Sequence, residues 1–143
     1  MKYIFLIAAT FIISSTAFAQ PGYDAQRVLG MLSSEANPIM VPKTIKANTE
    51  FDVTIATGGN GCVEQGDTSV ILSDRSADIF VYDVTRAIRP GTICTMIYKE
   101  FRHTAVLRFT KKGRAVIRIW VRKQSGRSPM GIPVLIEKRV VVR

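Results

Sequence analysis

Apolar and polar residues alternate along most of the chain after residue 38, and this alternation predicts its secondary structure. In the stretch FDVTIAT, the apolar Phe51, Val53 and Ile55 alternate with Asp52 and Thr54. A period of two places successive side chains on opposite faces, so that one face of a strand is buried and the other is solvated. The Gly-Gly-Asn-Gly run that follows ends this predicted strand.

Further strands follow the same pattern and are separated by turn residues. TSVILSDRSADIFVYDV predicts two strands joined by a polar turn at 73–76, and TICTMIYKEF predicts another. TAVLRFTKKGRAVIRIWVR predicts a hairpin that turns at Lys112 and Gly113, and IPVLIEKRVVV predicts the last strand. About seven short strands with turns between them predict an all-β fold, an antiparallel sandwich or barrel, over residues 38–143. A sandwich of this size would bury one face of each sheet and expose the other.

The segment before these strands has a different period. In DAQRVLGMLSSEA, apolar residues recur at Ala25, Val28, Leu29 and Leu32, and Asp24 precedes them as a helix cap. This spacing predicts a short helix, weakened by a glycine, or a loosely packed arm within residues 20–37. We expect this segment to pack onto the domain.

The first residues, MKYIFLIAATFIISSTAFAQ, have the three parts of a secretory signal peptide. Lys2 supplies the positive start, an apolar run follows, and Ala17-Phe18-Ala19 has the small-x-small form of a cleavage site. The apolar run is shorter than the ~20 residues needed to cross a bilayer. The sequence therefore predicts a signal peptide at 1–19, a periplasmic or extracellular location, and no stable membrane insertion after its removal.

Export affects how the two cysteines are interpreted. In an oxidising compartment, Cys62 and Cys94 are expected to form a disulfide rather than a metal or redox pair. Two bridged cysteines and a single histidine also leave too few nitrogen and sulfur ligands for a zinc site. We therefore expect no metal and no cofactor.

Four local features of the region 41–122 are shared with a known group of proteins. They are Gly-Cys at 61–62, Cys-Thr at 94–95, the run His-Thr-Ala-Val-Leu-Arg-Phe at 103–109, and the Gly113 turn before a β-branched strand. In these features the chain resembles small exported bacterial proteins with an immunoglobulin-like β-sandwich, mostly uncharacterised. The resemblance implies an immunoglobulin-like fold. It implies little about function, because this kind of sandwich hosts many unrelated roles.

Charge is distributed unevenly along the chain, whose formal net charge is +9. Residues 20–85 contain four basic and nine acidic side chains, a net charge of −5. Residues 86–143 contain fifteen basic and two acidic side chains, a net charge of +13. Such a division predicts a polarised surface, which affects association and solubility more than it affects the fold.

The stretch RAVIRIWVRK, residues 114–123, contains much of this positive charge. Its β-branched and aromatic residues predict a strand rather than a helix. One face of that strand would bring together arginines and an indole ring, with a further arginine from the preceding strand. Guanidinium groups bind phosphate or carboxylate, and the ring offers a stacking surface. The predicted anion-binding residues are Arg108, Arg114, Arg118, Trp120 and Arg122.

Several functional interpretations remain open at this stage. The main hypothesis is a binding module for an anionic macromolecule, which could be an envelope polymer, a nucleic acid or an acidic protein surface. The same residues also fit a solvated sheet face whose arginines cover Trp120 by cation–π contact. A third hypothesis is self-association through oppositely charged faces. A fourth is an enzyme inhibitor that inserts the loop RAIRPG or KQSGRSPMG into its target.

Catalysis is disfavoured by the residues present. His103 is the single histidine, and the chain contains no Gly-x-Ser-x-Gly nucleophile motif. The position of His103 just before a predicted strand indicates a hydrogen-bonded structural residue. We therefore expect that the protein is not an enzyme.

Overall fold

The computed structural model is all-β and describes residues 25–86, 91, 93–125 and 128–143. These residues form nine strands and no helix, which confirms the predicted fold class at the level of all-β. In chain order the strands are β1 (Ala25–Leu29), β2 (Ile39–Met40), β3 (Thr44–Ile45), β4 (Phe51–Gly59), β5 (Val63–Leu72), β6 (Ser76–Arg86), β7 (Lys99–Leu107), β8 (Gly113–Ser125) and β9 (Ser128–Val142).

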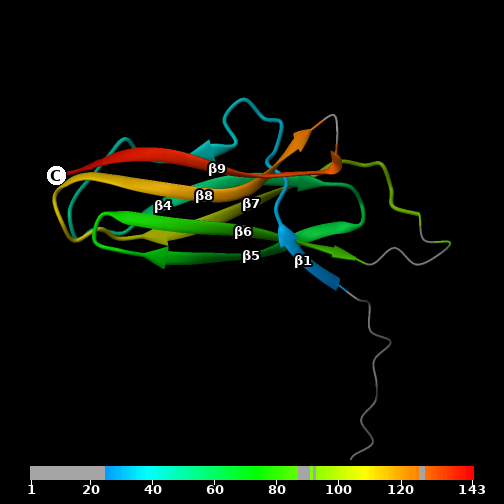
Figure 1. Cartoon of the computed structure of the whole chain (residues 1–143), viewed down its shortest axis with the longest axis horizontal. Coiled ribbons are helices and arrows are strands. Elements are labelled where there is room, and N and C mark those ends of the chain that lie inside the picture. Colours follow the sequence, from blue (N-terminus) through cyan, green and yellow to red (C-terminus); the bar gives the residue numbers. More distant parts are fainter. Residues whose placement is uncertain (1–24, 87–90, 92, 126–127) are drawn as a thin grey trace, which may run out of the picture.

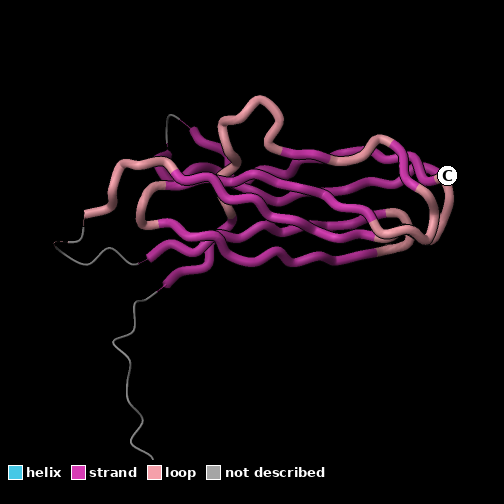
Figure 2. Tube along the Cα trace, turned by 180° about the vertical axis from the view of Figure 1, so that it is seen from behind, coloured by secondary structure: helices cyan, strands magenta, loops and turns pink. Residues whose placement is uncertain are grey.

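The strands form two sheets that run along the length of the molecule (Figure 1). The larger sheet has six strands in the order β1-β6-β8-β9-β3, with β5 also paired to β6. The smaller sheet has the order β2-β4-β7. Seen from behind, most of the connections between strands gather at the two ends of the molecule, and the C-terminus lies at one of them (Figure 2).

A single hydrophobic core is built from the inward faces of both sheets. Val53 and Ile55 of β4 contribute from the smaller sheet, and Ile79 of β6 and Ile119 of β8 contribute from the larger one, each with no exposed area. Burial of a side chain of this size stabilises the fold by about 1.5–3 kcal/mol relative to leaving it in water. The predicted alternation in β4 is thus confirmed, because it sets which face of the strand enters this core.

Two strand pairs are parallel, which corrects the expectation of a wholly antiparallel arrangement. β6 and β8 pair in parallel from Ser76↔Val116 to Phe80↔Trp120, and β3 pairs in parallel with β9. The reason is that β7 lies between β6 and β8 in sequence but belongs to the other sheet. The chain therefore crosses over the core and returns to the larger sheet in its original direction.

The prediction of a hairpin around Lys112 and Gly113 is also wrong. β7 pairs with β4, whereas β8 pairs with β6 and β9, so the two strands lie in different sheets. Gly113 does make the turn, with a φ of 121° that favours glycine. An alternating pattern specifies which face of a strand is buried but not which strand is its neighbour, and two strands can bury their apolar faces on one core from opposite sides.

The helix expected near Asp24 is replaced by a strand. β1 pairs antiparallel with β6, and Arg27 lies opposite Val84. Beyond Phe80↔Trp120, β6 and β8 are no longer paired with each other. The segment 25–32 lies between them: the Gly30 N–H donates to a carbonyl of β6, and the Leu32 N–H donates to a carbonyl of β8. We call residues 25–32 the inserted segment.

The inserted segment is a strand because the fold offers it backbone partners on both sides. A helix this short is marginal in water, while strand edges that separate inside a domain leave buried N–H and C=O groups to be paired. After leaving the larger sheet, the chain reaches the smaller one, where the Ser33 N–H donates to the Ala56 carbonyl at 2.9 Å. Residues 25–33 thus connect both sheets and do not form a separate arm.

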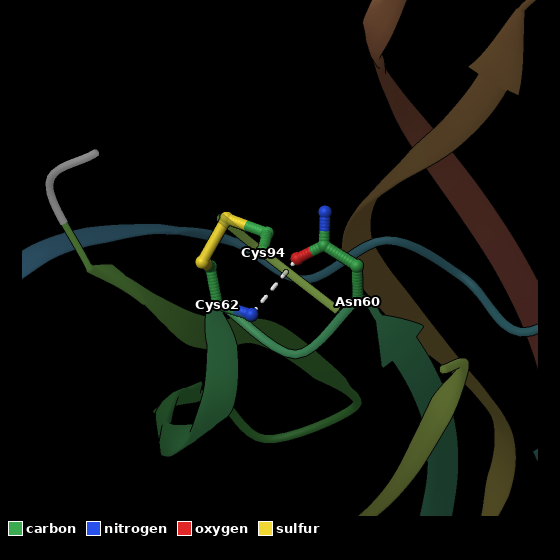
Figure 3. Close-up of a disulfide and its surroundings, with 3 residues drawn as sticks. All are labelled: Asn60, Cys62 and Cys94. Carbon is green, nitrogen blue, oxygen red and sulfur yellow. Dashed lines mark hydrogen bonds between the residues drawn. A yellow bond between two sulfur atoms is a disulfide. The ribbon is translucent and has the colours of Figure 1, made fainter. Parts of the chain in front are cut away.

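The disulfide predicted between Cys62 and Cys94 is confirmed, with Cα atoms 5.2 Å apart. Cys62 lies in the β4–β5 turn, where its N–H donates to the Asn60 side-chain oxygen at 3.0 Å (Figure 3). Beside it the Gly61 N–H donates to the Thr95 carbonyl at 3.0 Å. The disulfide therefore fixes the segment that precedes β7 to the β4–β5 turn.

Candidate functional site

The stretch 114–123 is a strand, as predicted, and lies within β8. Its inward side chains are buried in the core, and its outward side chains belong to the predicted anion-binding face. The inward residues are Ala115, Ile117, Ile119 and Val121; the outward residues are Arg114, Val116, Arg118, Trp120 and Arg122. The face therefore exists, and its function depends on what each of its side chains contacts.

The centre of that face is occupied by contacts with β6. Arg118 Nε lies 3.2 Å from the Asp78 Oδ1 atom, and Trp120 Nε1 donates to the same oxygen at 3.3 Å. The Trp120 ring stacks on Phe80, with 5.8 Å between centroids and 4° between planes. These contacts follow from the parallel register, which sets Asp78 beside Arg118 and Phe80 beside Trp120. Arg118 and Trp120 thus already have partners within the sheet.

Arg122 lies at the point where the inserted segment enters the sheet. Its Nε donates to the Leu29 carbonyl, and its own backbone N–H donates to the Gly30 carbonyl. Burial lowers the pKa of Arg122, and the nearby negative charge of Asp83 opposes that shift. This arginine holds the inserted segment in place in addition to any role at the surface.

Arg108 does not share a face with the other predicted residues. It follows β7 in the smaller sheet, and the next residue, Phe109, is buried in the core. Arg108 is exposed and continues the outward alternation of β7, on the opposite side of the molecule from Trp120. The expectation of one shared surface fails here because it depended on the β7–β8 hairpin that the fold does not form.

Several exposed basic residues belong instead to segments that lie at the end of the molecule with the C-terminal residue. Figure 1 shows the C-terminus and connections between strands at this end. These basic residues come from the β3 region, the β5–β6 turn, the β7–β8 connection with the start of β8, and the last residue. We call this set the basic end: Lys43, Lys46, Arg75, Arg108, Lys111, Lys112, Arg114 and Arg143. Two predicted residues, Arg108 and Arg114, belong to it.

Backbone hydrogen bonds join these separate segments at the basic end. The Ala47 N–H donates to the Arg143 carbonyl at 2.9 Å, and the Asn48 N–H donates to the Phe109 carbonyl at 2.8 Å. Asn48 has a φ of 60°, a left-handed conformation that asparagine tolerates better than most residues. The loop after β3 is therefore fixed against both the β7–β8 connection and the C-terminal residue.

The β5–β6 turn is fixed to the same end. The Arg75 carbonyl accepts a hydrogen bond from the Val116 N–H at 2.9 Å. The Arg75 guanidinium carbon lies 3.7 Å from the point where a Cβ on Gly113 would be, so this cation lies over the turn into β8. Lys111 pairs with Asp74. Among the residues that the structure describes, this is the one ion pair made by a member of the basic end.

Three arginines at the opposite end are paired with acids. Arg27 donates two hydrogen bonds to Asp67, at 2.8 and 2.7 Å, and its guanidinium lies 3.4 Å from the centroid of the Tyr82 ring. The Arg27 guanidinium lowers the pKa of Asp67. Further ion pairs at this end join Arg86 to Glu64, and Arg102 to both Glu35 and Glu100. We call this the disulfide end.

A buried polar cluster lies between the sheets toward the disulfide end. His103 Nε2 is 3.0 Å from Asp83 Oδ1 and 2.9 Å from Thr57 Oγ1, and all three side chains are buried. His103 is hydrogen-bonded, as expected, but it lies inside β7 rather than before it. Asp83 and Thr57 were not predicted. The signal was present, because each is a polar residue at an inward position of an otherwise apolar alternation.

Between the disulfide and this cluster is a cavity of about 330 Å³. Its wall includes Met31, Val63, Tyr98 and both cysteines, and Asp83 and Arg122 contribute polar groups. Asp83 Oδ2 has no hydrogen-bond partner among the residues that the structure describes. The cavity is thus mostly apolar, with a buried carboxylate in its lining.

Comparisons with known proteins found no match. No family model matches the chain, and no curated protein or solved structure matches it either. Across the described part of the chain, no cluster of three or more histidine, cysteine, aspartate or glutamate residues is arranged to hold a metal ion. The described residues also contain no helix long and apolar enough to cross a membrane.

Proposed function

We propose that the chain is an exported, non-catalytic binding module that holds an anionic polymer at its basic end. The observation that supports this proposal is the convergence of eight exposed cations from four segments that are distant in sequence. Close packing of like charges costs free energy that an anionic partner relieves, and release of its counterions adds to the affinity.

Local pairing distinguishes the arginines of the disulfide end from the cations of the basic end. Three acidic side chains, Asp74, Glu50 and Asp52, lie near its eight cations, and Asp74 is paired with Lys111. Arginines at the disulfide end already have carboxylate partners. A polyanion that contacts those arginines has to displace the carboxylates paired with them. A polyanion that contacts the basic end breaks fewer existing ion pairs.

The outward face of β8 has a secondary place in this proposal. Arg114 belongs both to that face and to the basic end. Arg118 and Trp120 are engaged with Asp78 and Phe80, so they lie beside the contact surface and are not its centre. Arg122 is half-buried beneath the inserted segment.

Export and an immunoglobulin-like sandwich are part of the same proposal. The disulfide supports an oxidising compartment, and two sheets around one core are compatible with a sandwich. The leader at 1–19 lies outside the described residues, as do parts of the two loops that an inhibitor would insert, at 87–90 and 126–127. A non-catalytic role is supported by His103, which is 2% exposed and faces Asp83 inside the protein.

Self-association of unlike ends is a weaker alternative. It requires an acidic surface for the basic end to meet, yet the carboxylates of Glu64, Asp67 and Glu100 are already paired with arginines. Sedimentation of the protein without any ligand, over a range of salt concentrations, distinguishes this alternative, since it predicts a larger species at low salt.

The test of the proposal is the salt concentration at which the protein elutes from a heparin column. The double variant Lys46→Glu/Arg75→Glu should elute much earlier than the wild type. The matched control Lys99→Glu/Arg102→Glu changes the net charge equally at the disulfide end and should elute much closer to the wild type. Arg118→Glu, compared with Arg75→Glu alone, measures the contribution of the sheet face.

Two results would contradict the proposal. If the wild type passes through heparin at low salt, no polyanion site exists. If both double variants elute at the same salt concentration, net charge and not a local surface determines retention. For a defined oligonucleotide, neutralising two contacts should also reduce the slope of log affinity against log salt by about 1–2.

A further inference from the structure

The cavity beside the disulfide has features of a small-molecule site. Its volume of about 330 Å³ is at the lower end of the ~300–1,000 Å³ typical of ligand pockets. Segments from both sheets line it, including the end of β4, the start of β5, the C-terminal part of β6 and that of β8. It is located where β6 and β8 are no longer paired, beside the inserted segment, whose Met31 contributes to its wall.

Two glycines and the two bridged cysteines form part of the cavity wall. Gly58 and Gly59 lie at the end of β4, and a Cβ on Gly58 would overlap the Tyr98 hydroxyl. A Cβ on Gly59 would lie 2.6 Å from Val63 Cβ. The absence of side chains at these two glycines lets Tyr98 and Val63 approach the strand closely, and both of them line the cavity.

The polar group of the cavity is the Asp83 carboxylate. Its side chain is 1% exposed, and its Oδ1 atom faces His103. Its Oδ2 atom has no hydrogen-bond partner within the described residues, although Asp83 lines the cavity. A buried carboxylate oxygen without a donor is costly. Gly30 lies beside Oδ2, since a Cβ there would be 2.8 Å from it, but it has no side-chain donor and its N–H donates to the Val81 carbonyl.

Charge around the cavity decides what kind of donor fits. Arg122 also lines the cavity, and it lies close enough for the charge of Asp83 to act on its pKa. An ammonium ligand would therefore meet a cation beside the carboxylate, in a protein that is already strongly basic. A neutral hydroxyl or amide N–H satisfies Oδ2 without that repulsion.

We propose that this cavity binds a neutral small molecule with an apolar, ring-sized body and one hydrogen-bond donor, which the Asp83 carboxylate accepts. The apolar body contacts Met31, Val63 and the disulfide. The site lies toward the disulfide end and does not depend on polyanion binding at the basic end, so each proposal can fail without the other.

The experiment compares phenol with toluene, which have nearly the same shape but differ in the hydroxyl donor. Methyl signals of Met31 and Val63 are followed by NMR while each compound is added to the wild-type protein. We expect saturable shifts at both methyl groups and about tenfold or greater preference for phenol, as for one hydrogen bond to a charged group. Equal affinities, or no saturable shifts with either compound, would overturn the proposal.

Two variants locate the site. Val63→Phe fills the cavity from its wall and should abolish phenol binding while heparin retention stays unchanged. Phenol shifts that persist in this variant would place binding elsewhere and refute the assignment. Asp83→Asn should reduce the preference for phenol over toluene. If that variant does not fold, the wild-type phenol-to-toluene ratio and Val63→Phe still decide the question.

Discussion

The two ends of this molecule differ in how their charged side chains are paired. At the disulfide end, arginines are paired with carboxylates, and the cluster of Asp83 with His103 is buried. At the basic end, eight exposed cations share one ion pair among the residues described. The buried charges position the fold, and the exposed ion pairs add little stability but occupy their arginines. Crowded unpaired cations do little for the fold and are available to a partner. The comparison separates residues that maintain structure from residues that are available for binding.

Removal of the disulfide should have the largest effect on stability. The variant Cys62→Ala/Cys94→Ala loses a link between positions 32 residues apart, which corresponds to about 3–4 kcal/mol on the chain-entropy estimate. Urea unfolding followed by circular dichroism measures this change. A loss below about 1 kcal/mol would mean that the disulfide end is held by its other contacts and that the disulfide is dispensable.

The next largest effect is expected for the buried carboxylate. Asp83→Ala leaves His103 without its acidic partner, at a cost of about 2–3 kcal/mol in unfolding free energy. Asp78→Ala is the matched control, since Asp78 is on the outward face of the same strand and its partly exposed ion pair is worth under ~1 kcal/mol. Equal losses in the two variants would remove the distinction between buried and exposed carboxylates.

Neutralisation of the basic end should leave stability nearly unchanged. Lys46→Ala/Arg75→Ala removes two exposed cations for which the structure shows no ion pair, so the unfolding free energy should change by less than about 0.5 kcal/mol or rise slightly through reduced repulsion. The same urea titration, repeated at low and high salt, measures it. A clear destabilisation would show that these side chains serve the fold.

The smallest effect concerns pH at the Arg27–Asp67 pair. Because Arg27 lowers the pKa of Asp67, the folded state holds this proton more weakly than the unfolded state. The stabilisation is therefore present above the unfolded pKa and is lost as pH falls through the folded pKa. Arg27→Gln should lose less stability than the wild type between about pH 5 and about pH 2. Identical pH profiles would show that the pair adds nothing.

The sequence predicted strand faces well and strand partners poorly. The alternation in β8 correctly separated Ile117 and Ile119 from Arg118 and Trp120, because burial on one face determines that pattern. It did not predict that β7 and β8 lie in different sheets, since both pairings bury the same side chains. Arg108 was misplaced for this reason alone.

Local sequence patterns could not predict the conformation of the inserted segment or the contacts of the polar cluster, for different reasons. The spacing of Ala25, Val28 and Leu29 fits a helix in isolation, but two separated strands supplied partners that only the tertiary fold creates. Asp83 and Thr57 appeared as single polar residues in apolar alternations, and nothing local showed that both would meet His103. The basic end depends in the same way on turns that become neighbours only after folding.

The position of the inserted segment also limits the order in which strands of the larger sheet can pair during folding. One of its edges binds β6, from the middle of the chain, and the other binds β8, from its last third. During synthesis, residues 25–32 are therefore made before β6 and β8, the two strands with which they pair. Contacts so distant in sequence slow the search for the native state, and this part of the larger sheet cannot close before β8 has been synthesised.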